Sequence, residues 1–364
     1  QELDLSLEYL MQGEEEQLED VIKELEGIKD SKRKIEILEA SLIYAGENGL
    51  KGIAFKLGHL LFNNYIKTDE PEKTQRMISR YYELWKKSSL KDKDMIFFRD
   101  IAGFLFSAGE YGQAAGYYRS LGKVSKKHGL LDSMAYASSC EAACHVKLGK
   151  YELAHEIAVS LKEIVDRMKN GLEKGSVYKM LAMLSLRKAS DRFPWYETKA
   201  YEFYCENAEY KAEAMYDFAS MMFDVSMKEK AAAYVENAIM LYPDNNQQPY
   251  AEFMLKCIEE LVDNEVNEPA KERCSGALNL AIKTGNLRHM EKAYYLKARV
   301  LESEGDSINA EIYYNLSLDT LLKFGTNSEL QRKYMQVGEM YYKMGNTKEA
   351  LRHMDFAIKI EKKV

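Results

Sequence analysis

Small residues recur along this chain about every forty residues, each after a glycine and a short polar stretch. Residues 109–114 (GEYGQA) return as 149–154 (GKYELA), and residues 305–310 (GDSINA) return as 345–350 (GNTKEA). A fixed period of this size is the signature of a repeat architecture in which each repeat is a pair of helices. At the same spacing lie Thr74, Ala231 and Ala270, with a further turn expected near residues 191–195.

The positions between these marks match the tetratricopeptide repeat (TPR), a helix-turn-helix unit. With Ala350 at the twentieth position of the repeat, Gly338 falls at the eighth, Tyr341 at the eleventh and Ala357 at the twenty-seventh. Small residues are needed where the two helices of a pair approach closely, and aromatic residues fill the space between pairs. The pattern predicts an all-α fold, a right-handed α-solenoid of about eight to nine TPR-like helix pairs with a period of about 40 residues.

The regularity of the repeats divides the chain into two predicted regions. Residues 1–68 are expected to form acidic, divergent N-terminal helical repeats, and residues 69–364 one continuous TPR-like array. The first thirty residues hold eleven acidic side chains and two lysines. This segment reads as the solvated face of a capping helix pair, or as a contact to a basic partner.

Composition supports long helices and an intracellular protein. The five prolines stand where turns or helix starts are expected, and no stretch is apolar enough for a membrane helix. The five cysteines are odd in number and share no spacing, so we interpret them as buried thiols in a reducing cytoplasm. Because the sequence begins at Gln1, it is expected to be either an excised piece or a processed mature chain; a cleaved leader would make the protein extracytoplasmic.

Residue patterns that carry chemistry are missing from the sequence. The six histidines have no metal-ligand spacing, and we find neither a nucleophile elbow nor a phosphate-binding glycine loop. We therefore expect no enzymatic activity, no metal and no cofactor. The net charge of −7 disfavours direct contact with nucleic acid, and residues 35–63 form helices too long for a DNA-reading helix-turn-helix. A homodimer is compatible with this architecture.

A TPR array binds its ligands on the concave face, which the first helix of each pair lines. The second, fifth, ninth and twelfth positions of each repeat look into that groove. Tyrosines dominate these positions and can stack on side chains or bond to a peptide backbone; 26 of 364 residues are tyrosine, about twice the average share. The predicted ligand-binding residues are Tyr136, Ser139, Tyr216, Ser220, Phe223, Glu259, Tyr295, Arg299, Glu302, Met335, Glu339 and Tyr342.

The long repeat and the last unit, residues 337–350 (VGEMYYKMGNTKEA), resemble the sensor regions of Gram-positive quorum-sensing receptors. The resemblance implies a cytoplasmic TPR protein that binds short imported peptides, preceded by a DNA-binding domain or a three-helix effector bundle. No such effector is evident at the start of this chain. In that family asparagines on inner helices clamp the peptide backbone; the candidates by type are Asn207, Asn237, Asn279 and Asn315, which the repeat frame places on the second helices.

Three hypotheses of function follow. The first is a ligand-sensing TPR protein that binds a short peptide or partner segment in its groove, as the regulatory part of a transcriptional regulator. The second is a static interaction scaffold or adaptor. Co-chaperone scaffolds of this type hold a carboxylate tail with several basic groove residues, and only Arg299 and Lys343 are candidates here. The third is an extracytoplasmic TPR protein.

Overall fold

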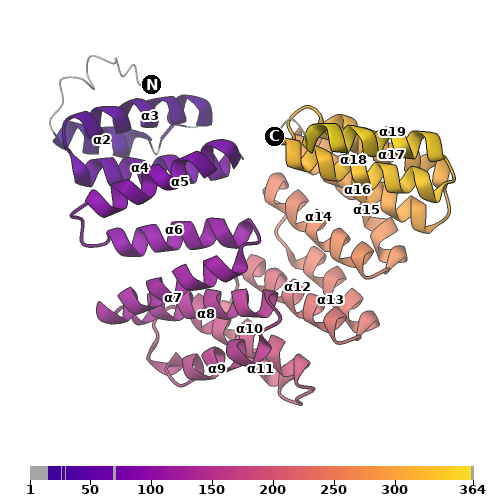
Figure 1. The fold of residues 1–364 in the computed structure, drawn as a ribbon. Helices are drawn as coiled ribbons and strands as arrows, with labels where there is room; N and C mark the ends of the chain where they lie inside the picture. Colours follow the sequence, from indigo (N-terminus) through magenta and orange to yellow (C-terminus); the bar gives the residue numbers. More distant parts are fainter. Residues whose placement is uncertain (1–14, 26, 29, 69–70, 362–364) are drawn as a thin grey trace. The chain divides into compact units, whose positions relative to one another are not determined.

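A computed structural model describes residues 15–25, 27–28, 30–68 and 71–361, and these form α-helices and turns without a strand (Figure 1). The all-α fold of TPR-like helix pairs is thus confirmed. The eighteen helices are α2 (Glu15–Leu25), α3 (Ser31–Glu47), α4 (Lys51–Lys67), α5 (Pro71–Lys87), α6 (Lys93–Ser107), α7 (Tyr111–Lys127), α8 (Leu131–Lys147), α9 (Tyr151–Lys162), α10 (Gly171–Arg187), α11 (Phe193–Tyr204), α12 (Ala208–Asp224), α13 (Lys228–Leu241), α14 (Gln247–Asp263), α15 (Asn267–Thr284), α16 (Leu287–Ser303), α17 (Ser307–Leu321), α18 (Asn327–Lys343) and α19 (Thr347–Glu361).

The recurring small residue is the fourth residue of the second helix in each pair. We call the even-numbered helices from α4 to α18 the A helices and the odd-numbered ones from α5 to α19 the B helices. The fourth residue of a B helix is buried because it faces the partner A helix, where a larger side chain would separate the two. These residues, all at most 1% exposed, are Thr74, Ala114, Ala154, Ala231, Ala270, Ala310 and Ala350.

The one break in this series lies at α11. This helix begins at Phe193, inside the stretch where the sequence predicts a turn, with a proline in its first turn. Its fourth residue is Tyr196, which is also buried, at 7% exposure. Tyrosine therefore replaces the alanine of the repeat at this place, and the sequence period skips one unit.

Glycines close the A helices of the regular pairs. Gly109, Gly149, Gly305 and Gly345 follow α6, α8, α16 and α18 with φ between 70° and 81°. Glycine adopts this left-handed conformation without the steric cost that a Cβ atom brings. The less regular pairs use other residues at the equivalent turns, with φ between 49° and 63°: Ala189, Ser226 and Glu265.

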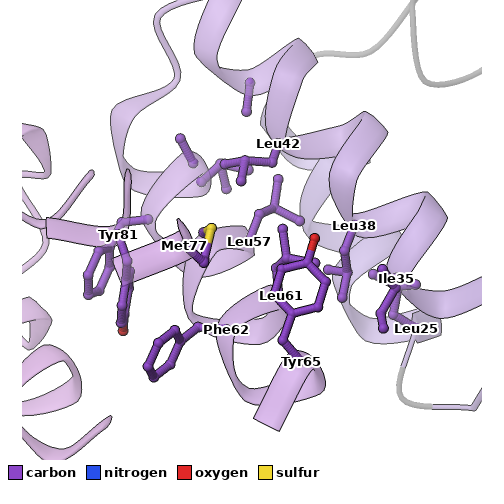
Figure 2. Packing of buried hydrophobic residues seen from close by; sticks show 14 of the residues in the cluster. Leu25, Ile35, Leu38, Leu42, Leu57, Leu61, Phe62, Tyr65, Met77 and Tyr81 are labelled. Atoms are coloured by element: carbon purple, nitrogen blue, oxygen red, sulfur yellow. The ribbon is translucent and has the colours of Figure 1, made fainter. Parts of the chain in front are cut away.

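Contacts divide the chain into two compact units, residues 1–184 and 185–364. The boundary that the sequence predicts after residue 68 separates divergent repeats from regular ones, and it stays a prediction. The first unit has an aromatic-rich core around α4 and α5 (Figure 2). There the ring of Tyr81 stacks on Phe55 and Phe62 at centroid distances of 5.5 and 5.3 Å, and its hydroxyl donates to Asp100 over 2.7 Å.

In the second unit each A helix packs on its own B helix and on the next pair. Gly338 lies where α18 crosses α19. A Cβ atom built on Gly338 would lie 3.0 Å from Cγ of Met354 and 3.3 Å from the carbonyl oxygen of Ala350. A larger residue here would require the Met354 side chain and the backbone at Ala350 to give way. A core cluster around Tyr314, Val337 and Tyr341 fills the space between α16–α17 and α18–α19.

The cysteines depart in part from the buried thiols that the sequence predicts. All five are free, and Cys144, Cys257 and Cys274 are buried. Cys140 is half-buried and Cys205 is exposed. Cys205 ends α11 with φ of 52°, which turns its side chain away from the helix packing.

Candidate functional site

Residues of two neighbouring A helices meet in a pocket of about 310 Å³ in the second unit. On each of these helices the lining residues are three or four positions apart, so they lie on one face of the helix. Tyr314 of α17 and Met340 of α18 complete the wall. The polar members are Tyr295, Arg299 and Glu302 on α16, and Gln336, Glu339 and Lys343 on α18.

Tyr295 is the aromatic surface of this pocket. The ammonium group of Lys333 lies 3.8 Å from the centroid of its ring, and the Tyr314 ring packs against it edge-on at 5.9 Å. Burial raises the pKa of Tyr295, so its hydroxyl stays protonated at neutral pH. That hydroxyl has no hydrogen-bond partner among the residues that the structure describes, and a ligand could therefore bond to it.

The charges of the pocket are mostly paired. Arg299 forms an ion pair with Asp263 of α14. Glu302 accepts a hydrogen bond of 2.6 Å from the hydroxyl of Tyr314 and lies 3.2 Å from the ammonium group of Lys343. These contacts fix the directions of the side chains before any ligand arrives, which lowers the entropic cost of binding.

Two further pockets continue this surface along the A helices. One of about 490 Å³ shares Arg299, Glu302 and Lys343 and reaches the end of α14 and the start of α15. Another of about 300 Å³ shares Gln336 and reaches the first turns of α16 and α18. We call the line of three pockets the α16–α18 groove.

Four residues predicted from the repeat positions are brought together in this groove: Tyr295, Arg299, Glu302 and Glu339. On α16 the predicted stripe and the lining residues coincide. On α18 the lining stripe is Gln336, Glu339 and Lys343, one residue later at two of its three places. Met335 and Tyr342 are exposed, at 37% and 68%, but do not line the pockets. A one-residue step around a helix is about 100°, which is enough to move a side chain off the groove.

The predicted residues of α12 line none of the pockets described above, and one of them, Tyr216, packs against α14. Tyr216 donates a hydrogen bond of 2.8 Å to Glu260, and the ammonium group of Lys256 lies 3.9 Å from its ring centroid. Phe223 is buried and Ser220 is half-buried. Glu259, another predicted groove residue, is held by Lys292 at 2.7 Å. A role in ligand binding stays a prediction for each of them.

Tyr136 lies in the first unit, in a pocket of about 370 Å³ with Arg99, Asp132 and Glu173. The Arg99 guanidinium lies 5.6 Å from the ring centroid of Tyr136. Burial, with Asp132 nearby, raises the pKa of Glu173 to about 7. Ser139, one turn further along α8, is buried and its hydroxyl has no partner among the described residues.

Several lining residues were not predicted. Tyr314 is a core residue in the repeat frame, and it is buried as expected, yet its hydroxyl reaches the pocket wall. Gln336 carries no motif, and the sequence names Lys343 only as a basic candidate for holding a carboxylate tail. Of the asparagines suggested by the family resemblance, Asn237, Asn279 and Asn315 lie on B helices as the frame expects, while Asn207 caps the start of α12.

Within the described ranges no group of three or more acidic, cysteine or histidine residues is placed to hold a metal ion. None of the described helices is long and apolar enough to cross a membrane.

Comparison with known proteins gives no match to a family model and no match to a curated protein. Among solved structures, a Rap protein complexed with Competence and Sporulation Factor is 12% identical, with a TM-score of 0.52 over 95% of this chain and 98% of the other. The apo form of the quorum sensor NprR from B. thuringiensis is 14% identical, with a TM-score of 0.48 over 94% of this chain and 99% of the other. Aspartyl phosphate phosphatase F from Bacillus subtilis is also 14% identical, with a TM-score of 0.48 over 98% of this chain and 90% of the other. At these identities the likeness concerns the fold alone. The chain thus has the TPR-like fold of the Rap protein, and the resemblance inferred from its repeats is confirmed at the level of the fold.

Proposed function

We propose that this chain is a ligand-sensing TPR protein that binds a short peptide, or an extended segment of a partner, in the α16–α18 groove. The observation that carries the proposal is the meeting of Tyr295, Arg299, Glu302 and Glu339 in one pocket. Their positions in the repeat predict that they face a ligand, and the helices present them together. A pocket of this kind suits binding better than catalysis, because most of its charged groups are paired with neighbours.

The chemistry of the groove matches an extended peptide. A peptide backbone offers alternating N–H donors and C=O acceptors. Gln336 can serve both with its amide, Glu339 accepts from N–H groups, and the hydroxyl of Tyr295 can donate to a carbonyl. The ring of Tyr295 offers a surface on which a ligand side chain can pack. The Rap protein with the same fold was solved in complex with Competence and Sporulation Factor, which supports the peptide hypothesis.

Regulation follows from how the groove is built. Its walls come from separate helix pairs, and each pair of a solenoid contacts only its neighbours. A peptide that touches α14, α16 and α18 at once would favour one spacing of these pairs over others. We propose that this shift is the signal, that the chain is the regulatory part of a cytoplasmic transcriptional regulator, and that it catalyses no reaction.

The test is an affinity selection with a library of random pentapeptides on the full chain, followed by titration calorimetry of the retained peptides. We expect Arg299→Gln to weaken their binding by about tenfold, the usual loss for a charge-assisted hydrogen bond. The matched control is Lys297→Gln on the same helix, because Lys297 faces α15, where it reaches the hydroxyl of Ser275 at 3.3 Å. Retention of no peptide, or equal losses in both variants, would refute the proposal.

A further inference from the structure

The pocket at the first turns of α16 and α18 is dominated by basic side chains. We call it the basic pocket. Two acidic residues, Glu291 and Glu329, and the neutral Leu321 and Gln336 complete its lining. Its basic members are Arg288, Lys292, Arg332 and Lys333.

Two of these four cations are neutralised inside the pocket. Lys333 pairs with Glu291 at 2.6 Å, and Arg288 pairs with Glu329 at 2.8 Å. The other two are not. Lys292 is held by Glu259 of α14, which does not line the pocket. Arg332 is exposed and has no ion-pair partner among the residues that the structure describes. The Glu259 carboxylate offsets the charge of Lys292 from outside the lining, so Arg332 is the one cation of the pocket without a paired carboxylate among the described residues.

The paired residues form a rigid frame for the other two. Lys333 is only 7% exposed and lies against the ring of Tyr295, and Glu291 also accepts a hydrogen bond of 2.7 Å from Ser317. Glu329 belongs to a capping box: its side chain accepts from the backbone N–H of Thr326 over 2.8 Å, and the Thr326 hydroxyl accepts from the backbone N–H of Glu329. Such preorganisation leaves little side-chain entropy to be lost when an anion binds.

We propose that the basic pocket binds a carboxylate, the C-terminal carboxylate of the peptide held in the neighbouring part of the groove. This inference rests on the function proposed above. Gln336 lines both pockets, so one short chain can occupy both. The guanidinium of Arg332 can hold the two carboxylate oxygens side by side, and Lys292 adds a second cation.

The inference also fixes the direction of the peptide. The basic pocket lies at residues 329–336 of α18, and the pocket that contains Tyr295 and Arg299 lies at residues 336–343. The peptide would run with its C-terminus at the first turn of α18 and its N-terminal residues toward Lys343. Its backbone would then be antiparallel to α18.

A paired selection tests this inference. The random pentapeptide library is made in two forms, with a free C-terminal acid and with a C-terminal amide, and each is offered to the full chain. We expect the acids to be retained and the corresponding amides to bind about tenfold more weakly. In Arg332→Glu this preference should disappear. Lys348→Glu makes the same change of charge on an exposed part of α19 and should keep the preference.

The outcomes separate the two proposals. If neither library is retained, the proposed function itself fails. If acids and amides of the same sequences bind equally well, the peptide hypothesis stands and the carboxylate site is wrong. Amides retained only when they contain aspartate or glutamate would show that the pocket takes an acidic side chain, which also overturns the C-terminal assignment. Displacement of retained acids by inorganic phosphate is expected, since both anions would compete for Arg332.

Discussion

The ammonium group of Lys333 on α18 lies 3.8 Å from the centroid of the Tyr295 ring on α16, a cation–π contact that links the two helices. The same ammonium group is paired with Glu291, one turn before Tyr295. Burial lowers the pKa of Lys333 while the Glu291 carboxylate opposes that change. The contact joins the second last and the last helix pairs at the floor of the groove, and it couples the stability of that interface to the shape of the site.

Tyr295→Ala should therefore lower the free energy of unfolding as well as weaken ligand binding. The ring is half-buried against Tyr314, and its loss leaves a void and an uncovered lysine. We expect a loss of about 2–3 kcal/mol, at the low end for aromatic truncation because the site is partly open. Tyr342→Ala removes a side chain that is 68% exposed and should change stability by less than about 0.5 kcal/mol. Thermal unfolding of both variants checks this, and equal losses would place Tyr342 in the core.

Breaking the buried ion pair should cost more than removing it whole. Lys333→Met leaves Glu291 charged and only partly solvated, and we expect a loss of about 3–5 kcal/mol. The double variant with Glu291→Leu should recover most of that loss, because no uncompensated charge remains. Urea unfolding of the single and double variants measures the difference. A double variant as unstable as Lys333→Met would mean that packing under Tyr295, rather than charge, holds this contact.

Gly338 should tolerate no larger side chain. Leucine there would meet Met354 and the backbone of Ala350, so Gly338→Leu should lose about 3 kcal/mol or more through overpacking. Gly276 is the control: it also lies inside a helix, but a Cβ atom there would meet nothing within 4 Å. Gly276→Ala should stabilise the chain by about 0.5–1 kcal/mol through helix propensity. Thermal melting of the two variants is followed by circular dichroism. If neither change altered the melting temperature, the packing of α18 on α19 would be contradicted.

The sequence predicts the fold well because the helix crossings demand small residues at fixed places. Alanines at the fourth position of B helices and glycines after A helices give a period that survives divergence elsewhere. The signal weakens where the structure uses other residues for the same task, as at Tyr196, Ser226 and Glu265. Ser226 and Glu265 adopt a left-handed backbone that their residue types do not indicate, and Tyr196 takes the buried place of an alanine inside α11.

The site is predicted less completely, because a position in a repeat gives the angle around a helix only approximately. On α16 three of the predicted groove residues line the pocket. On α18 the lining residues Gln336 and Lys343 each follow a predicted residue, Met335 and Tyr342, by one position, and which of them bind a ligand stays a prediction. The basic pocket was not predicted, since its character depends on which cations pair with which carboxylates across helices.

Glu173 in the first unit should make stability depend on pH. Its pKa is raised from 4.5 to about 7 in the folded chain, mainly by burial, with Asp132 adding to the shift and Arg99 opposing it. Because the pKa is raised, the folded chain holds the proton of Glu173 more tightly than the unfolded chain does. The stability that this gives is complete below about pH 4.5 and is lost as the pH rises through 7. Glu173→Gln, which mimics the protonated form, should match the parent chain at pH 4.5.

At pH 8 the same variant should be more stable than the parent by about 1–2 kcal/mol, a value reduced from the full shift because the side chain is half-exposed. Melting curves of both proteins from pH 4.5 to 8 give this difference directly. A constant difference across the range would show that folding leaves the pKa of Glu173 unshifted.

The central claim is that a peptide binds along the inner surface of α16 and α18. Hydrogen–deuterium exchange of the full chain, with and without a peptide retained in the selection, tests it most directly. We expect slower amide exchange in residues 287–303 and 327–343 when the peptide is bound, and no such change in Arg299→Gln at the same peptide concentration. Protection confined to other helices, with α16 and α18 unchanged, would contradict it.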